Sequence, residues 1–152
     1  MCWTGNLKDK KVASEAVTVY KILAWDRFNR KYVAPYQRTE YKIGKMYTIS
    51  SLIPTKHLFG EYLINEGFHT LNKDCLVCYG SCCDALIYGQ NDVECMLIRV
   101  RLTDLPVIAK CTIPKGAVYY ENSMGVIVSD SLIVNEVYED LPFEKKHFHE
   151  II

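Results

Sequence analysis

The stretch "VIAKCTIPKGAVYYE", Val107–Glu121, decides the fold. Its first seven residues are mostly apolar and include β-branched side chains, a composition typical of a strand. Pro114 and Gly116 then supply the residues of a tight turn. The residues after the turn, "AVYYE", again favour a strand. Two strands joined by so short a turn predict an antiparallel pair.

The segments on either side of this pair extend the β pattern. Strands are predicted within Gly125–Glu139, on both sides of Ser129-Asp130-Ser131, and at Glu94–Thr103, where apolar residues alternate. Earlier strands are predicted at Ala16–Trp25, Lys31–Ala34 and Tyr41–Thr48, and Gly44 predicts a bulge or a close approach of the backbone in the last. A helix is predicted to begin near Cys75. The prediction is therefore an α+β domain, β-rich, with about seven short, largely antiparallel strands and one or two short helices.

Length and charge limit the class of protein. The 152 residues fit a single domain, 1–152, with a loose N-terminal arm at 1–15 and a charged tail at 141–152. The charges of eighteen basic and eighteen acidic residues cancel, which argues against binding of nucleic acid or membrane through the overall charge of the protein. No apolar run approaches the roughly 20 residues of a membrane span. Seven cysteines and a polar start of the chain predict a cytoplasmic protein with free thiols.

Four cysteines form the pattern C-x2-C-x3-C-C: Cys75, Cys78, Cys82 and Cys83. Structural zinc sites usually pair two ligand groups that are well separated in sequence, and these four lie within nine residues. Their neighbours are apolar, and buried cysteine behaves as a small hydrophobic residue. Packing is the favoured interpretation, with a redox or metal role as the alternatives. No metal and no cofactor are predicted.

The turn Gly67-Phe68-His69-Thr70 is the main candidate for a ligand site. Glycine permits a tight turn and phenylalanine can anchor it, which would hold His69 at a fixed angle for acid–base chemistry or binding. Tyr41 and Lys42 are added as ligand-binding candidates. The alternative, which is favoured, is a structural histidine that is hydrogen-bonded to a neighbouring loop.

A basic and aromatic stretch spans residues 30–47, where lysine and arginine interleave with four tyrosines. Positive charge combined with stacking rings is how single-stranded nucleic acid is held, so a nucleic-acid-binding module is one hypothesis. A strand with tyrosines inward and lysines outward explains the same pattern and is favoured. Nucleic acid is therefore not the expected partner.

Three motifs carry a resemblance to a family: "YKIGK", "GFHT" and "CTIPKGxxYY". With the strands around them, they make residues 17–138 similar to small uncharacterised proteins of gut Bacteroides species and their phages. The resemblance implies a bacterial or phage source and no particular activity.

The order of elements also resembles ADP-ribosyltransferase-like domains. Lys21 on an early strand, His69 in the middle and Glu136 on a late strand fall in comparable order and become the catalytic candidates. That resemblance implies NAD binding. The chain departs from it by having lysine where arginine is expected and by lacking Ser-Thr-Ser and Glu-x-Glu, so any such domain would be degenerate.

These observations leave three hypotheses about function. The leading one is a non-enzymatic binding or interaction protein whose partner is a protein or a small molecule. The alternatives are a degenerate ADP-ribosyltransferase-like domain and a nucleic-acid-binding module. Whether the chain is an enzyme stays open at this point, and no membrane association is predicted.

Overall fold

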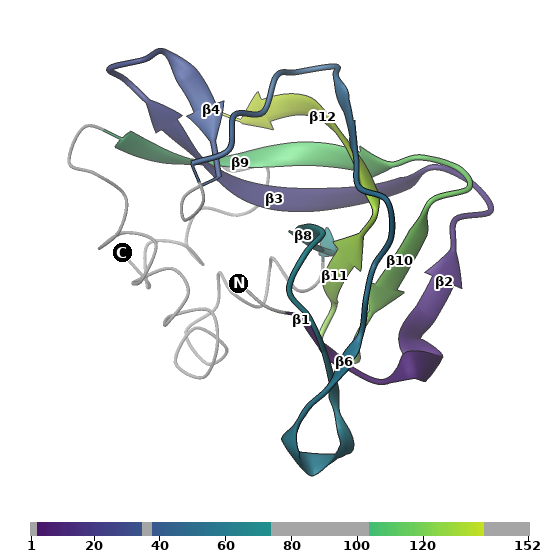
Figure 1. Ribbon diagram of the computed structural model, residues 1–152. Coiled ribbons are helices and arrows are strands. Elements are labelled where there is room, and N and C mark those ends of the chain that lie inside the picture. Colours follow the sequence, from purple (N-terminus) through teal and green to yellow (C-terminus); the bar gives the residue numbers. More distant parts are fainter. Residues whose placement is uncertain (1–2, 35–37, 74–103, 139–152) are drawn as a thin grey trace.

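The computed structural model describes residues 3–34, 38–73 and 104–138. They form twelve strands and two 3-10 turns, drawn in Figure 1. In chain order these are β1 (Trp3–Gly5), η1 (Leu7–Asp9), β2 (Lys10–Val12), β3 (Val17–Asp26), β4 (Lys31–Val33), β5 (Met46–Thr48), β6 (Thr55–Lys56), η2 (Leu58–Gly60), β7 (Tyr62–Ile64), β8 (Phe68–Leu71), β9 (Asp104–Ile113), β10 (Val118–Glu121), β11 (Val126–Ser129) and β12 (Ser131–Tyr138).

The strands form two sheets. The larger has nine strands in the order β2-β10-β11-β8-β3-β9-β12-β5, with β4 paired to β3 as well. The smaller has the order β1-β7-β6. Every pairing is antiparallel, and the long strands β3 and β9 run side by side across the molecule (Figure 1). The tip between β6 and β7 projects at the bottom of the same view, away from the large sheet.

The β3–β9 ladder is the centre of the fold. Ten residue pairs join the two strands, from Val17–Ile113 to Asp26–Asp104. Because alternate residues of a strand share a face, one face of this ladder carries most of the buried apolar side chains. Its buried core contains Ala13, Val19, Leu23, Tyr41, Ala109, Cys111, Ile113, Ala117, Tyr119, Ile127, Leu132 and Val134.

The α+β prediction is wrong. Over the described residues the chain forms twelve strands, rather than about seven, and the helical elements assigned there are two short 3-10 turns. The error arose because several strands are two to four residues long and show no periodicity of their own. The predicted helix near Cys75, the predicted strand Glu94–Thr103 and the tail at 141–152 lie outside the described residues.

The N-terminal segment, which was predicted to be a loose arm, carries β1 and β2. Trp3 is fully buried and packs with Ile64, Tyr120 and Val128. Its indole N–H donates a hydrogen bond to the carbonyl of Val126 over 2.9 Å. A large side chain that loses all contact with water therefore ties β1 to the large sheet.

Gly44 lies in a turn rather than in a strand bulge. Its φ is +85°, and the amide of Lys45 donates to the carbonyl of Lys42 across the turn. The strand that was predicted over Tyr41–Thr48 is accordingly shortened to β5. No helix among the described residues has the length and apolar character needed to cross a membrane.

Candidate functional site

Lys21 has an unusual position for a lysine, on the core face of β3. Val19 and Leu23, two residues away on either side, are both fully buried. The ammonium donates a hydrogen bond to the carbonyl of His69 over 2.8 Å and lies 5.7 Å from the centroid of the Tyr41 ring. Loss of hydration disfavours the charged form and lowers the pKa of Lys21 to about 8, although the nearby Cys111 thiol acts in the opposite direction.

This lysine lies beside the shortest pairing in the large sheet, between β3 and β8. β8 pairs with β11 over four residues but with β3 at a single position, Tyr20–Leu71. If that ladder continued, His69 would lie opposite Ile22, and it does not. The Lys21 side chain supplies the contact in place of the missing backbone pairing. Its hydrogen bond to the carbonyl of His69 links β3 to β8, and its cation–π contact with Tyr41 further stabilises the charge.

The His69 ring is held by a backbone carbonyl. Nε2 lies 3.2 Å from the carbonyl oxygen of Ile64, which accepts a hydrogen bond from the ring in the tautomer that carries the proton on Nε2. Burial of the ring, reinforced by the positive charge of Lys21, lowers the pKa of His69 to about 4. A histidine with so low a pKa is a weak base at neutral pH and is poorly matched to acid–base catalysis. This geometry favours the structural interpretation.

His69 is expected to make the fold sensitive to mild acid. Its pKa is about 4 in the folded state and near 6.5 when unfolded, so the unfolded chain binds the proton first as the pH falls. Its contribution is complete above pH 6.5 and is lost as the pH falls to 4, with about 2–3 kcal/mol lost between pH 7 and pH 4.5. Urea denaturation at pH 7 and pH 4.5 should show this loss in the wild type and a smaller loss in His69→Gln.

The control is His57→Gln, because the His57 side chain is exposed. This variant should lose as much stability as the wild type over the same pH range. An equal loss in His69→Gln would show that His69 is not the group responsible.

The other ligand-binding candidates lie partly in this turn and partly in the segment between β4 and β5. Gly67 has φ of +142° and Phe68 packs against the main core. Thr70 is 2% exposed, and its hydroxyl has no hydrogen-bond partner. Tyr41 is also buried, and its ring meets that of Tyr47 edge to face at 5.1 Å. Lys42 is exposed, and its amide donates to the hydroxyl of Tyr47 over 2.8 Å.

Glu136 lies on the opposite face of the sheet from Lys21. It pairs with Lys110, whereas Lys21 pairs with Ala109 of the same strand, and neighbouring residues of a strand point to opposite faces. The Glu136 carboxylate accepts a hydrogen bond from the Tyr138 hydroxyl over 3.0 Å. The structure thus brings Lys21 to the backbone of His69 and leaves Glu136 apart from both.

A register shift in β12 explains where Glu136 lies. Val134 pairs with Cys111 and Glu136 with the adjacent Lys110, so Asn135 is an extra residue on this strand. Simple alternation from Val134 would place Glu136 on the core face with Lys21. The extra residue reverses that parity, because a slip of one residue exchanges the two faces of a strand.

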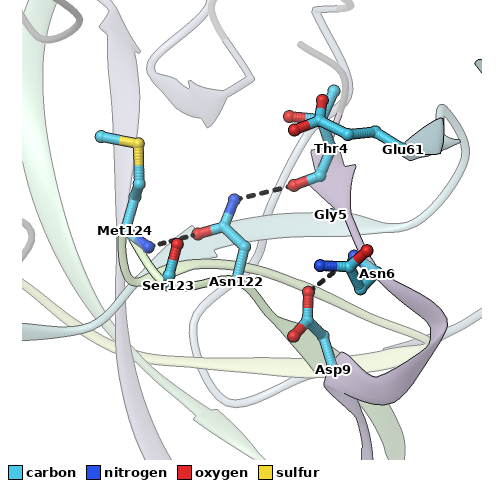
Figure 2. A pocket seen from close by; sticks show the side chains of 8 residues that line it. All are labelled: Thr4, Gly5, Asn6, Asp9, Glu61, Asn122, Ser123 and Met124. Atoms are coloured by element: carbon cyan, nitrogen blue, oxygen red, sulfur yellow. Dashed lines mark hydrogen bonds between the residues drawn. The ribbon is translucent and has the colours of Figure 1, made fainter. Parts of the chain in front are cut away.

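A shallow pocket of about 150 Å³ lies between the N-terminal strand and the turn after β10 (Figure 2). Two of its polar side chains, Asn122 and Asp9, are engaged in structural hydrogen bonds. The Asn122 side chain donates to the carbonyl of Thr4 and accepts from the amides of Met124 and Val126, while Asp9 accepts from the amide of Asn6. The residues around it are Thr4, Gly5, Asn6, Asp9, Glu61, Asn122, Ser123 and Met124.

Metal and thiol chemistry have no visible site in the described ranges. No three His, Cys, Asp or Glu side chains gather there in a group that could hold a metal ion. Cys111 is a buried free thiol, and burial raises its pKa to about 12, far from the range of a reactive thiolate. Cys75, Cys78, Cys82 and Cys83 lie outside the described residues.

The surface feature that sequence reasoning missed is the tip of the β6–β7 hairpin. Phe59 is 98% exposed and Leu58 is 70% exposed. Phe59 has a left-handed backbone, with φ 68° and ψ 21°, and Gly60 follows with φ 76°. The amide of His57 donates to the carbonyl of Glu61 over 2.8 Å and closes the loop. In the sequence, Pro54 and Gly60 interrupt this segment and predict a loop and a short strand, without indicating that Phe59 is exposed.

Comparison with known proteins gives no family for this chain: no family model, no curated protein and no solved structure matches it.

Proposed function

We propose that the protein is a non-enzymatic interaction module that inserts the Leu58–Phe59 tip into an apolar pocket of a protein partner. The observation that carries this proposal is the phenylalanine that is 98% exposed at the end of a projecting hairpin. Burial of two such side chains is worth about 1.5–3 kcal/mol each, enough for them to act as anchors of an interface.

The backbone of the tip supports a role in binding. A bulky residue with positive φ is a conformational outlier that costs about 1–3 kcal/mol. Because the Phe59 side chain is 98% exposed, its burial within the fold does not offset this cost. The hydrogen bond between His57 and Glu61 holds the loop closed in this conformation. A tip that is ordered before binding loses less entropy when it docks.

A protein pocket fits the tip better than a lipid surface does. Two apolar side chains bury less hydrocarbon than a single acyl chain, which by itself gives only marginal membrane binding. The positive charge of Lys56 beside the tip is offset by Glu61. The transferase alternative gains no support from the site, because Glu136 is on the opposite face of the sheet from Lys21.

The test begins with a stability measurement that needs no partner. Phe59→Asn should leave the free energy of unfolding unchanged or raise it by up to about 1 kcal/mol, because asparagine tolerates the left-handed conformation. Chemical denaturation of both proteins measures this. A loss of more than about 1 kcal/mol would mean that Phe59 supports the fold, and the proposal would fail.

Binding is measured next, on a partner captured from cell extract, purified and titrated by calorimetry. The Leu58→Ser/Phe59→Ser variant should weaken the interaction about 10²–10³-fold. Ile43→Ser is the matched control, because Ile43 is a 53% exposed apolar residue in a different turn, and it should bind like the wild type. Equal binding by the double variant contradicts the proposal, and tip-dependent sedimentation with neutral vesicles would replace the protein partner with a membrane.

A further inference from the structure

A second exposed aromatic residue lies at the turn between β3 and β4. Phe28 is 84% exposed, with Arg27 and Arg30 exposed on either side of it and Lys31 partly buried next to them. Within the described part of the chain, none of these three cations has an acidic partner, since the ion pairs there are Lys11–Glu121 and Arg38–Asp26. The turn therefore presents a ring among unpaired positive charges.

The turn is fixed by a buried carboxylate. Asp26 is 3% exposed and accepts hydrogen bonds from the amides of Phe28 and Asn29, over 3.0 and 3.1 Å. It also accepts from the Asn29 side chain at 2.8 Å and from the Arg38 guanidinium at 3.4 Å. These donors, the Asn29 side chain foremost, hold the pKa of Asp26 below its usual range, so the carboxylate stays charged. Phe28 is thus held in solvent by a turn that is already ordered.

The positive charge here is local. The whole chain carries 18 basic and 18 acidic residues, so a basic overall composition does not account for the patch. Asp26 is the one acidic residue of the segment Asp26–Lys31 and is engaged by Arg38, whereas Arg27, Arg30 and Lys31 give this segment a net positive charge. Trp25 and Tyr32, one step back in the hairpin, pack against each other at 4.7 Å and are only partly buried.

The basic and aromatic character is concentrated in this hairpin rather than over the later part of residues 30–47. Tyr41 is buried in the core and Tyr47 packs against it, so neither ring is free to stack on a ligand. Lys45 lies over the Tyr47 ring at 5.2 Å. The inward packing of tyrosines thus explains that segment, whereas the Phe28 side chain is 84% exposed.

We propose that the β3–β4 hairpin tip, Asp26–Lys31, binds single-stranded nucleic acid, with Phe28 stacking on an unpaired base and Arg27, Arg30 and Lys31 contacting phosphates. Exposed rings supply sequence-independent stacking, and nearby cations follow the backbone. An acidic peptide would satisfy the cations but would leave the Phe28 ring without a partner. A duplex keeps its bases paired and stacked, so one projecting ring has no free base face to meet.

The experiment measures the binding of the full-length chain to labelled 12-nucleotide oligo(dT) and oligo(U) by fluorescence anisotropy at several salt concentrations. Wild-type protein should bind with Kd of about 10⁻⁴–10⁻⁶ M at low salt, and log K should fall against log salt with a slope near −2, from three phosphate contacts at about 0.7 each. Arg27→Gln and Arg30→Gln should each reduce that slope by about 0.7. Phe28→Ser should weaken binding about 5- to 100-fold with the slope unchanged.

Two controls match these changes. Lys115→Gln removes an exposed cation from the turn between β9 and β10, and Phe59→Asn removes an exposed ring from the other hairpin. Both should bind like the wild type. Phe59→Asn changes only the Leu58–Phe59 tip, whereas Phe28→Ser changes only the β3–β4 hairpin. The two variants therefore test the protein-binding proposal and the nucleic-acid-binding proposal separately.

Several outcomes would overturn the inference. Absence of saturable oligonucleotide binding, or binding that Phe28→Ser and Arg27→Gln leave unchanged, removes it. Equal affinity for a duplex of the same length removes the stacking role. Binding of poly-glutamate that matches oligonucleotide binding and survives Phe28→Ser would assign the patch to acidic protein partners instead.

Discussion

Replacement of Trp3 by alanine is expected to lower the free energy of unfolding by about 3–5 kcal/mol. The side chain is fully buried against Ile64, Tyr120 and Val128, and its ring centroid lies 5.3 Å from that of Tyr120. Alanine would leave a cavity and also remove the N–H that donates to the carbonyl of Val126. Guanidinium denaturation followed by circular dichroism measures the change.

Two variants separate the contributions at this position. Trp3→Phe keeps an aromatic ring but lacks the N–H, so it should lose only about 1–2 kcal/mol. Val12→Ala, at a 62% exposed position on β2, should change stability by less than about 0.5 kcal/mol. A loss below 1 kcal/mol in Trp3→Ala would mean that the N-terminal strand is not an integral part of the fold. Because β1 pairs with β7, Trp3→Ala should also loosen the hairpin that carries Phe59.

Gly67→Ala is expected to destabilise the protein by about 2–4 kcal/mol, from two causes that act together. The backbone φ of +142° is a conformation that residues with a Cβ atom rarely adopt. In addition, a Cβ atom there would lie 2.6 Å from a methyl carbon of Val128 and 2.8 Å from one of Leu52. Thermal and urea denaturation of the variant measure the loss.

Gly116→Ala is the matched control for this substitution. Gly116 also has a positive φ, +89°, but a Cβ atom there would meet nothing within 4 Å. Its cost should therefore be the backbone term alone, about 1 kcal/mol. Similar losses in the two variants would show that steric contact with Val128 and Leu52 contributes nothing at Gly67.

The long strands could be predicted from the sequence because they carry their own pattern. The predicted strand at Ala16–Trp25 differs from β3 by one residue at each end, and the predicted strand at Val107–Ile113 lies within β9. Strands of two or three residues have no measurable alternation. β1 is stabilised by pairing with β7, which lies some sixty residues further along the chain. A local sequence pattern cannot reveal a partner at that separation.

The candidate site was only partly predictable. Lys21 and His69 were singled out by position and do meet, but the contact is with the His69 backbone rather than its ring. The placement of Glu136 depends on the extra residue Asn135, and a bulge in a strand leaves no reliable mark in a single sequence. The exposure of Phe28 and Phe59 could not be predicted from the sequence either, because an aromatic side chain in a loop most often packs against the rest of the protein.

The pairing of β3 with β9 has a consequence for biosynthesis. Its partner residues are separated by 78 positions at one end (104 − 26) and by 96 at the other (113 − 17). At about 5–20 residues per second, a ribosome needs roughly 4–20 s to extend the chain from β3 to β9. Throughout that interval β3 has made neither its longest ladder nor the core that depends on it.

Such non-local pairing makes folding slow and leaves an apolar strand open to association with other chains. Lys21, with its ammonium in the middle of that strand, is a charge of the kind that interrupts aggregation-prone β segments. The lysine that bridges to β8 in the folded protein would thus also act earlier, as a gatekeeper that keeps the nascent strand in solution until β9 has been made.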